Sequence, residues 1–237
     1  MISVILPCYN EIDSICLLVD EIHDNLVNYN HEILVVDDNS PDGTYKKLQD
    51  LNYPFLKPIL RIKNKGFANS IRCGIENAEG DIIIIMDSDF NHQPKYLPFM
   101  VESLKFYDCI LATRFVYGGD MGNRYRHTLS WIFNIFVRLM TGGKVTDSLY
   151  GFMAINSEVI NKIKFDKIFW GYGDYCIRLL YYLQENETSI LQFPAVNGKR
   201  IAGEGNANFL KVFKQYFLEV LKLSYRIKFQ KNVQRSD

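Results

Sequence analysis

Two aspartates follow directly on the most apolar stretch of the sequence. The segment IIIIMDSDFNHQP, residues 82–94, places Asp87 and Asp89 two positions apart behind four isoleucines and a methionine. Two like charges beside an apolar wall repel each other and lose solvation, so we expect a cation between them. Mg²⁺ and Mn²⁺ prefer oxygen ligands and commonly bind one or two carboxylates together with substrate phosphates. These residues therefore predict a divalent metal site, with Asn91 as a further oxygen ligand and His92 as a supporting residue.

A stripe of polar side chains suggests a phosphate-binding helix face. Arg126, Ser130 and Asn134 are spaced four residues apart, so on a helix they share one face among Trp, Ile and Phe side chains. Arginine suits phosphate because its planar fork makes paired, charge-assisted hydrogen bonds. The sequence has neither a GxxxxGKS/T loop nor a GxGxxG motif after its first apolar segment, which disfavours the P-loop and dinucleotide-binding folds.

These residues need a sheet that brings them together. Over residues 1–115, apolar segments that read as strands alternate with segments of helical periodicity. This β-α-β alternation predicts an α/β fold with a mostly parallel sheet and helices on both faces. Ligands of such sheets bind outside the carboxyl ends of the strands, where four polar clusters fall: PCYNE, DDNSPDG, DSDFN and TR. Each cluster alone is typical of a solvated turn, but four at one edge indicate a site.

The second half of the sequence is less regular. A helix is expected over 125–140, a strand and a helix in GFMAINSEVINKI, a helix in DYCIRLLYYLQ and a strand in ETSILQFPAV. We expect one domain over 1–208, with the metal residues in its first half, 1–120, and a second half over 121–208. A last helix is expected over about 207–229, within a basic, amphipathic tail at 209–237.

The overall composition is that of a globular protein, and its charge names no partner. Hydrophobic residues make up 48% and the formal net charge is zero, so we expect no nucleic-acid partner. The charge is nevertheless uneven: residues 1–50 hold ten Asp and Glu against two Lys, whereas 209–237 hold seven Lys and Arg against two Asp and Glu. Five cysteines without a CxxC spacing indicate reduced thiols in a reducing compartment.

The basic tail allows two interpretations. Either its helix packs on the domain, or it lies on an anionic membrane surface through apolar burial and basic charge together. No segment of the sequence reaches the ~18 uncharged apolar residues of a spanning helix. We therefore expect a cytoplasmic protein that is peripheral at the inner face of the membrane.

Several motifs resemble those of a known family. The segments ILPCYNE, ILVVDDNSPDGT, NKGFANS through KYLPFM, ATRFVYGG, RHTLSWIFN and TDSLYGFMAINSEVI resemble glycosyltransferase family 2, of the GT-A fold. The likeness is strongest to the polyprenyl-phosphate sugar synthases of that family. It covers about residues 2–210 and is most specific over residues 1–120. The resemblance implies a metal-dependent transferase that uses Mg²⁺ or Mn²⁺ and a GDP- or UDP-linked sugar. Residues 1–208 would then be a catalytic domain, in which 1–120 form the nucleotide-sugar and metal half and 121–208 the acceptor half.

The resemblance also implies roles for individual residues. If the acceptor is a hydroxyl, a carboxylate must accept its proton, and Asp147 and Asp174 are the candidates. The metal would be bound by Asp87, Asp89 and Asn91. Asp89 would also be a catalytic residue, as would Arg126. The nucleotide sugar would be bound by Pro7, Tyr9, Glu11, Val36, Asp38, Ser88, Arg114 and Arg200.

We predict an inverting glycosyltransferase that moves a sugar from a nucleotide-diphosphate sugar to a polyprenyl phosphate. A family 2 enzyme that acts on a glycan hydroxyl in cell-surface polysaccharide synthesis is the alternative. The late loop RIAGEGNAN departs from the R-x-x-G-E-S-K pattern typical of mannose synthases, which leaves the sugar open. A non-catalytic nucleotide-binding module is the hypothesis from another class, and the Asp87 and Asp89 pair argues against it.

Overall fold

The computed structural model describes residues 1–199 and 209–234, with the side chains of the second range described at 212–229. Arg200 and the glycine-rich loop that follows it lie outside the described residues. Within these ranges, no helix is both long enough and apolar enough to cross a membrane.

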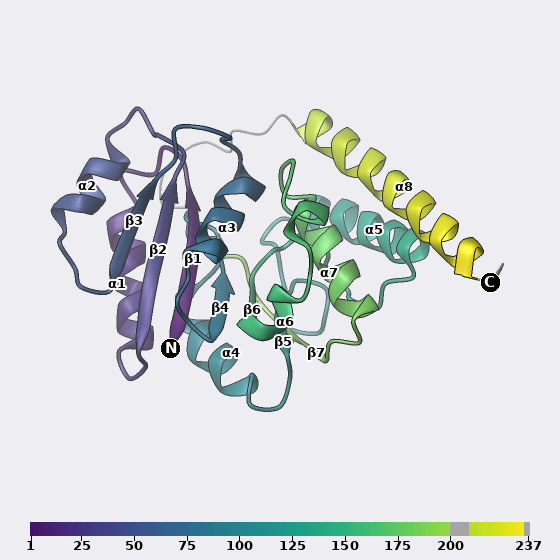
Figure 1. Ribbon diagram of the computed structural model, residues 1–237, viewed down its shortest axis with the longest axis horizontal. Coiled ribbons are helices and arrows are strands. Elements are labelled where there is room, and N and C mark those ends of the chain that lie inside the picture. The colour runs from purple at the N-terminus through teal and green to yellow at the C-terminus, as the bar shows by residue number, and fades with distance from the viewer. Residues whose placement is uncertain (200–208, 235–237) are drawn as a thin grey trace.

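The described residues form one seven-stranded sheet of β1 (Ile2–Cys8), β2 (His31–Asp37), β3 (Leu56–Leu60), β4 (Ile82–Ile85), β5 (Cys109–Thr113), β6 (Met153–Asn156) and β7 (Ile190–Pro194). Their order in space is β3-β2-β1-β4-β6-β5-β7 (Figure 1). The pairs among β1 to β4 are parallel, as is the pair of β5 with β7, whereas β6 runs antiparallel to both β4 and β5. The predicted α/β fold with a mostly parallel sheet is confirmed.

Helices cover both faces of this sheet (Figure 1). The α-helices of the described chain are α1 (Ile15–Leu26), α2 (Thr44–Asp50), α3 (Phe67–Glu76), α4 (Leu97–Ser103), α5 (Arg124–Thr141), α6 (Ser157–Asn161), α7 (Tyr175–Glu185) and α8 (Phe209–Gln234). One core joins the sheet to α1 and α4, and a second joins it to α3 and α7. Because strand residues alternate between faces, Ile84 and Met86 belong to the first core and Ile83 and Ile85 to the second. The isoleucine run is therefore buried on both sides, which explains its lack of polar residues.

The tail helix α8 packs on the domain, beside α5 and at the end of the molecule away from β3 (Figure 1). A third, smaller core lies between α5, α7 and α8 and consists of Phe133, Val137, Ile177, Tyr181, Val220, Leu223 and Ile227. Other large apolar side chains of α8 are exposed, among them Leu218, Tyr225 and Phe229. The helix thus has one apolar face that is buried and a second that the described chain does not cover.

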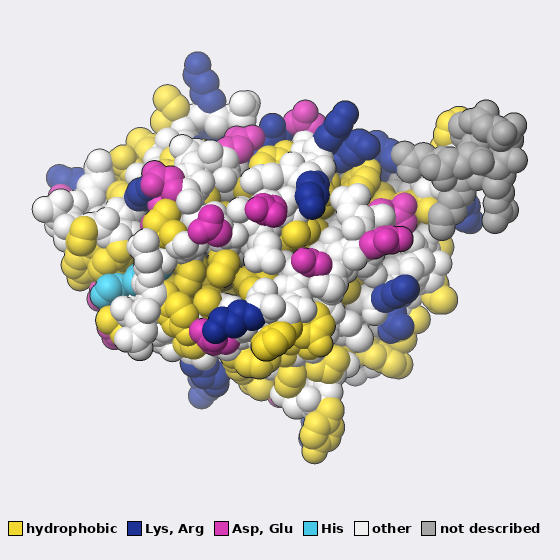
Figure 2. All heavy atoms as spheres, turned by 60° about the horizontal axis from the view of Figure 1, so that its bottom comes forward, with side chains coloured by type: hydrophobic (Ala, Val, Ile, Leu, Met, Phe, Trp, Pro, Cys, Tyr) yellow, Lys and Arg dark blue, Asp and Glu magenta, His cyan; other side chains and the backbone are white. Residues whose placement is uncertain are grey.

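The side of the molecule on which β1 begins carries mixed charges. Figure 2 brings this side forward and shows Lys and Arg side chains interspersed with Asp and Glu, with apolar side chains between them. A basic stripe of the kind that follows a nucleic-acid backbone is not visible among the residues coloured on this face.

Candidate active site

A cavity of about 1160 Å³ opens at the carboxyl edge of the sheet and has two chemically different halves. Its polar half contains the residues that follow β1, β2, β4 and β5. Its apolar half is lined by Phe133 and Phe136 of α5 and by Phe213 and Phe217 of α8. Nine residues predicted from the sequence line this one cavity: Pro7, Tyr9, Glu11, Asp38, Asp87, Ser88, Asp89, Arg114 and Arg126.

The turn after β4 sets the two carboxylates that are predicted to hold a metal. The backbone N–H and the side-chain amide of Asn91 both donate to Asp89, over 3.0 and 2.7 Å. Phe90, between them, has a φ of 66°, a left-handed conformation that bulky residues rarely adopt and that often marks functional turns. Asn91 itself does not line the cavity, so its observed role is to hold Asp89 in position.

The donor set fits a divalent metal that is shared with a substrate. Asp87 and Asp89 are both partly exposed and both line the cavity. In the part of the chain that the structure describes, no group of three or more His, Cys, Asp and Glu side chains is arranged to hold a metal. Mg²⁺ and Mn²⁺ suit a pair of carboxylates because they keep other ligand positions for water and substrate phosphates.

His92 supports this turn from the core. Its ring stacks on Phe152 with 4.8 Å between centroids and is almost completely buried. Burial, with a smaller contribution from the charge of Arg114, lowers the pKa of His92 to about 3. The ring is therefore neutral, and its Nδ1 accepts a hydrogen bond from the backbone N–H of Asp87 over 2.8 Å. This geometry agrees with the supporting role expected for His92.

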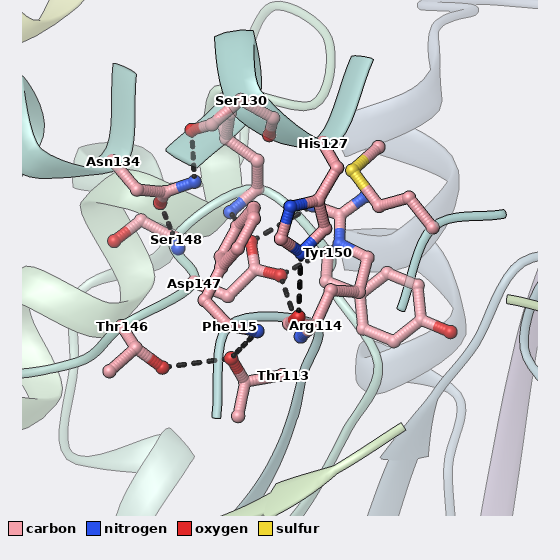
Figure 3. A network of polar contacts seen from close by, with 12 residues as sticks. Thr113, Arg114, Phe115, His127, Ser130, Asn134, Thr146, Asp147, Ser148 and Tyr150 are labelled. Atoms are coloured by element: carbon pink, nitrogen blue, oxygen red, sulfur yellow. Dashed lines mark hydrogen bonds and ion pairs between the residues drawn. The ribbon is translucent and has the colours of Figure 1, made fainter. Parts of the chain in front are cut away.

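A buried arginine completes the polar half of the cavity. Arg114 follows β5, and Asp147 holds its guanidinium through two contacts, Nε to Oδ2 at 2.8 Å and Nη2 to Oδ1 at 2.9 Å (Figure 3). Burial, the largest single effect, lowers the pKa of Arg114, but the charge and the hydrogen bonds of Asp147 and smaller contributions together raise it above its usual value, so the guanidinium stays protonated. Because Arg114 also lines the cavity, its fixed positive charge is available to an anionic ligand there.

Asp147 and Asp174, the two candidate proton acceptors, do not line the cavity. Asp147 has no exposed surface, and neither has Asp174. Asp174 pairs with Arg178 over 2.5 Å and also accepts from the backbone N–H of Tyr172 and the side chain of Gln215, over 2.8 and 3.1 Å. A general base must come within hydrogen-bond reach of the proton that it takes. The observed contacts of both residues instead position their arginines and the surrounding loops.

The predicted polar stripe of α5 divides into two parts. Arg126 and Ser130 line the cavity, whereas Asn134 is buried. The side chain of Asn134 donates to the backbone carbonyl of Ser130 over 2.9 Å and accepts from the backbone N–H of Ser148 over 2.7 Å (Figure 3). Asn134 thus ties α5 to the loop that carries Asp147.

Asp38, a predicted nucleotide residue in the polar half, is held by a residue that sequence reasoning missed. Arg61, which follows β3, pairs with Asp38 over 2.6 Å and also donates to Ser70 over 2.7 Å. The backbone N–H of Gly66 donates to the other oxygen of Asp38 over 2.6 Å. A basic residue directly after a strand, at the edge where the other polar clusters fall, is the signal that could have identified Arg61.

The remaining predicted nucleotide residues have different surroundings. The hydroxyl of Ser88 donates to the backbone carbonyl of Pro7 over 2.9 Å. This hydrogen bond joins the end of β1 to the turn of residues 87–92, named the metal turn after its predicted role. Glu11 accepts a hydrogen bond from Ser14 over 3.0 Å and is mostly buried. Val36 is completely buried in β2, where it faces α3, and it does not line the cavity.

Solved structures share this architecture. The glucosyl-3-phosphoglycerate synthase of Mycobacterium tuberculosis, in complex with Mn²⁺, uridine diphosphate and phosphoglyceric acid, is similar with a TM-score of 0.74. The identity is 20%, and the similarity covers 94% of this chain and 78% of that one. This likeness confirms the predicted GT-A type of fold.

The sequence comparisons define the family. The family described as Glycosyl transferase family 2 matches residues 3–164. The chain is 31% identical over 233 residues to the dolichol-phosphate mannosyltransferase of Pyrococcus furiosus, and the matched region covers 95% of this chain and 63% of that protein. It is 33% identical over 178 residues to the undecaprenyl-phosphate mannosyltransferase of Micrococcus luteus, which covers 71% of this chain and 72% of that protein. The chain therefore belongs to glycosyl transferase family 2, and it spans less than two thirds of the length of the Pyrococcus protein.

Proposed function

We propose that this chain is a metal-dependent, inverting glycosyltransferase that moves a sugar from a nucleotide-diphosphate sugar to a polyprenyl phosphate. One observation carries the proposal: a single cavity joins a pair of metal-type carboxylates and two arginines to an apolar half between α5 and α8. The relatives from Pyrococcus and Micrococcus support it, because their names refer to transfer involving dolichol phosphate and undecaprenyl phosphate.

The donor would occupy the polar half of the cavity. Asp87 and Asp89 would hold Mg²⁺ or Mn²⁺, which supplies neutralisation of the departing diphosphate. Arg114, fixed by Asp147, would bind a phosphate of the donor, and Arg200 stays a further prediction outside the described residues. The GDP or UDP part of the donor would lie against Pro7, Tyr9, Glu11, Asp38 and Ser88.

The acceptor would occupy the apolar half. Arg126 and Ser130 line the cavity on the first two turns of α5, and the rings of Phe133 and Phe136 follow on the same helix. This order suits a ligand with an anionic head and a hydrocarbon chain. Burial of such a chain against apolar surface contributes roughly 0.8 kcal/mol per CH₂ group.

The burial of Asp147 and Asp174 favours a phosphate over a hydroxyl as the acceptor. A phosphate is already anionic and can attack the sugar without a general base, whereas a hydroxyl must lose its proton. Both candidate bases are instead engaged in buried ion pairs, with Arg114 and Arg178. The contribution of the chain would then be to bind both substrates and to orient them in line.

A transfer assay with matched acceptors tests the proposed function. The purified chain is supplied with Mn²⁺, a labelled GDP- or UDP-linked sugar, and either a polyprenyl phosphate or the polyprenyl alcohol of the same chain length. We expect organic-extractable label with the phosphate alone, and none once EDTA has removed the metal. Transfer to a glycan and not to the phosphate would favour the glycan-hydroxyl alternative. Nucleotide-sugar binding without transfer or hydrolysis would favour the non-catalytic module.

Asp38→Asn is expected to weaken donor binding more than it slows the bound-state reaction. The change removes the charge shared by Arg61 and the backbone N–H of Gly66. A lost hydrogen bond to a charged group costs about 1.5–3 kcal/mol, which corresponds to roughly a ten- to hundredfold rise in the KM for the donor. Steady-state kinetics should show this rise with little change in kcat, and the exposed control Asp50→Asn on α2 should change neither. A lower kcat at an unchanged KM would speak against this role.

The uncovered apolar face of α8 would rest on an anionic membrane surface. Leu218, Tyr225 and Phe229 of α8 are large, apolar and exposed. Arg226 of the same helix is also exposed, and its positive charge complements anionic lipid. Apolar burial and basic charge together would hold the chain at the inner face of the membrane, next to its lipid acceptor.

Vesicle sedimentation tests this membrane contact. Removal of the whole tail would take Val220 and Leu223 out of the third core and uncover Phe133 and Ile177, so point variants are the better probe. We expect the chain to sediment with anionic vesicles, less so as salt is raised, and the double variant Tyr225→Ser/Phe229→Ser to sediment several-fold less. Phe106, an even more exposed aromatic near the end of α4, supplies the matched control Phe106→Ser, which should sediment like the wild type. A wild-type chain that ignores anionic vesicles at low salt would show that this face serves another purpose.

A further inference from the structure

Tyr150 lies where the cavity arginine and the metal turn meet. The guanidinium carbon of Arg114 lies 4.6 Å from the centroid of the Tyr150 ring. The hydroxyl of Tyr150 donates to the backbone carbonyl of Asn91 over 3.2 Å, and its ring meets the ring of His92 edge-on, with 4.5 Å between centroids. One buried side chain thus contacts both groups that would hold the donor diphosphate.

Each contact of Tyr150 with the metal turn leads to one of the two carboxylates. Asn91, which accepts from the hydroxyl, donates through its backbone and its side chain to Asp89. His92, which packs against the ring, accepts from the backbone N–H of Asp87 and places its Nε2 3.6 Å from the carboxylate Oδ2. The hydroxyl of Tyr150 is therefore linked to Asp89 through Asn91, and the ring is linked to Asp87 through His92.

The hydroxyl and the ring of Tyr150 are each suited to the group that they contact, the carbonyl of Asn91 and the guanidinium of Arg114. Burial raises the pKa of Tyr150 above its usual value, although the charge of Arg114 opposes this effect. The hydroxyl therefore keeps its proton and can donate to a carbonyl, which can only accept. The ring faces a cation that is partly removed from water, where a cation–π contact is strongest. Gly198 donates to the same carbonyl of Asn91 over 2.9 Å, so the carbonyl is held from two sides.

We infer that Tyr150 is a positioning residue that fixes the spacing between Arg114 and the carboxylates of Asp87 and Asp89. With this spacing fixed, the arginine and the metal can hold one diphosphate at the same time. The inference rests on the proposed function. It implies that metal binding strengthens nucleotide binding partly through Tyr150, which also lines the cavity and acts here through Arg114 and the turn of residues 87–92.

The coupling between metal and nucleotide binding tests this role. GDP and UDP are titrated into the full chain by calorimetry, once with Mn²⁺ and once with EDTA, and the ratio of the two dissociation constants is the coupling. Tyr150→Phe keeps the ring contacts with Arg114 and His92 and removes the hydroxyl alone. We expect its coupling ratio to fall about three- to tenfold, the range for one lost hydrogen bond, while the affinity in EDTA changes less than about twofold.

Two further variants separate positioning from general damage. Tyr29→Phe removes a hydroxyl that donates to the exposed Glu102 over 2.9 Å, and it should leave the ratio unchanged. Tyr150→Leu removes the ring as well and should lower the affinity in both conditions, with thermal unfolding to show that each variant is folded. An unchanged ratio in Tyr150→Phe overturns the inference and leaves the proposed function standing. A wild-type chain whose nucleotide affinity does not respond to Mn²⁺ overturns both.

Discussion

Replacement of Asp89 by alanine is expected to lower sugar transfer at least about a hundredfold while the protein stays folded. Asp89 is one of the two cavity carboxylates that fit a divalent metal, and the metal would neutralise the leaving diphosphate. Asn91, in the same turn, donates two hydrogen bonds to Asp89, and Asp89 is partly exposed, so we expect its removal to leave the fold intact. Loss of one of two like charges should even relieve repulsion in the metal-free protein.

Two measurements separate a lost metal from a lost fold. Initial rates at saturating Mn²⁺ report transfer, and thermal unfolding with Mn²⁺ and a nucleoside diphosphate reports binding, because a ligand of the native state raises the unfolding temperature. The ligand-dependent rise should vanish in Asp89→Ala and persist in the control Asp166→Ala, which removes an exposed carboxylate paired with Arg72. Near-normal turnover by a folded Asp89→Ala protein would rule out the metal assignment.

Asp147→Ala is expected to damage stability and activity together. Asp147 is completely buried and accepts from the side chain and the backbone of Arg114. Removal of one partner of a buried ion pair leaves an uncompensated charge, which costs about 3–5 kcal/mol. This is a large share of the ~5–15 kcal/mol that stabilises a typical domain, so the midpoint of urea unfolding should fall strongly. Activity should fall as well, because Arg114 loses the partner that fixes its direction.

A double variant distinguishes the two effects of Asp147. Arg114→Met/Asp147→Ala removes both charges, and replacement of a buried pair by apolar groups is often neutral for stability. We expect the double variant to recover much of the lost stability and none of the lost activity. Wild-type stability in Asp147→Ala would contradict the buried pair, and restored transfer in the double variant would contradict a phosphate-binding role for Arg114.

The gathering of the polar clusters could be predicted from the sequence for a simple geometric reason. A β-α-β repeat produces parallel strands, and parallel strands end at the same edge of a sheet. Asp38, Asp87 and Arg114 follow three different strands and line one cavity. The position of Asp89 beside Asp87 at this cavity could be predicted for the same reason, because both belong to the turn that follows a strand buried on both faces.

The burial of the two candidate bases could be predicted only in part, because a sequence shows a carboxylate without its partner. Asp147 meets Arg114, 33 residues away, through a loop that precedes β6, and the antiparallel insertion of β6 between β4 and β5 has no signal in the β-α-β pattern. Asp174 differs, because Arg178 follows it by four residues, a spacing at which helical side chains pair. The ion pair of Asp174 with Arg178 could therefore have been predicted from the sequence spacing.

The tail shows the limit of a periodicity argument. Its apolar stripe is broader than one packing face, so the pattern is compatible with packing on the domain and with contact with a membrane. In the structure Val220 and Leu223 are buried between helices, whereas Leu218 and Tyr225 stay exposed on the same helix. Only the neighbouring helices α5 and α7 decide which part of the stripe is covered.

The most direct measurement of the shared cavity is a crystal structure of the chain with Mn²⁺, a nucleoside diphosphate and a short-chain prenyl phosphate. We predict an anomalous Mn²⁺ signal beside Asp87 and Asp89, a diphosphate within reach of Arg114, and the prenyl chain between α5 and α8. A metal bound away from these carboxylates, or a prenyl chain outside the cavity, would contradict the claim that one cavity holds both substrates.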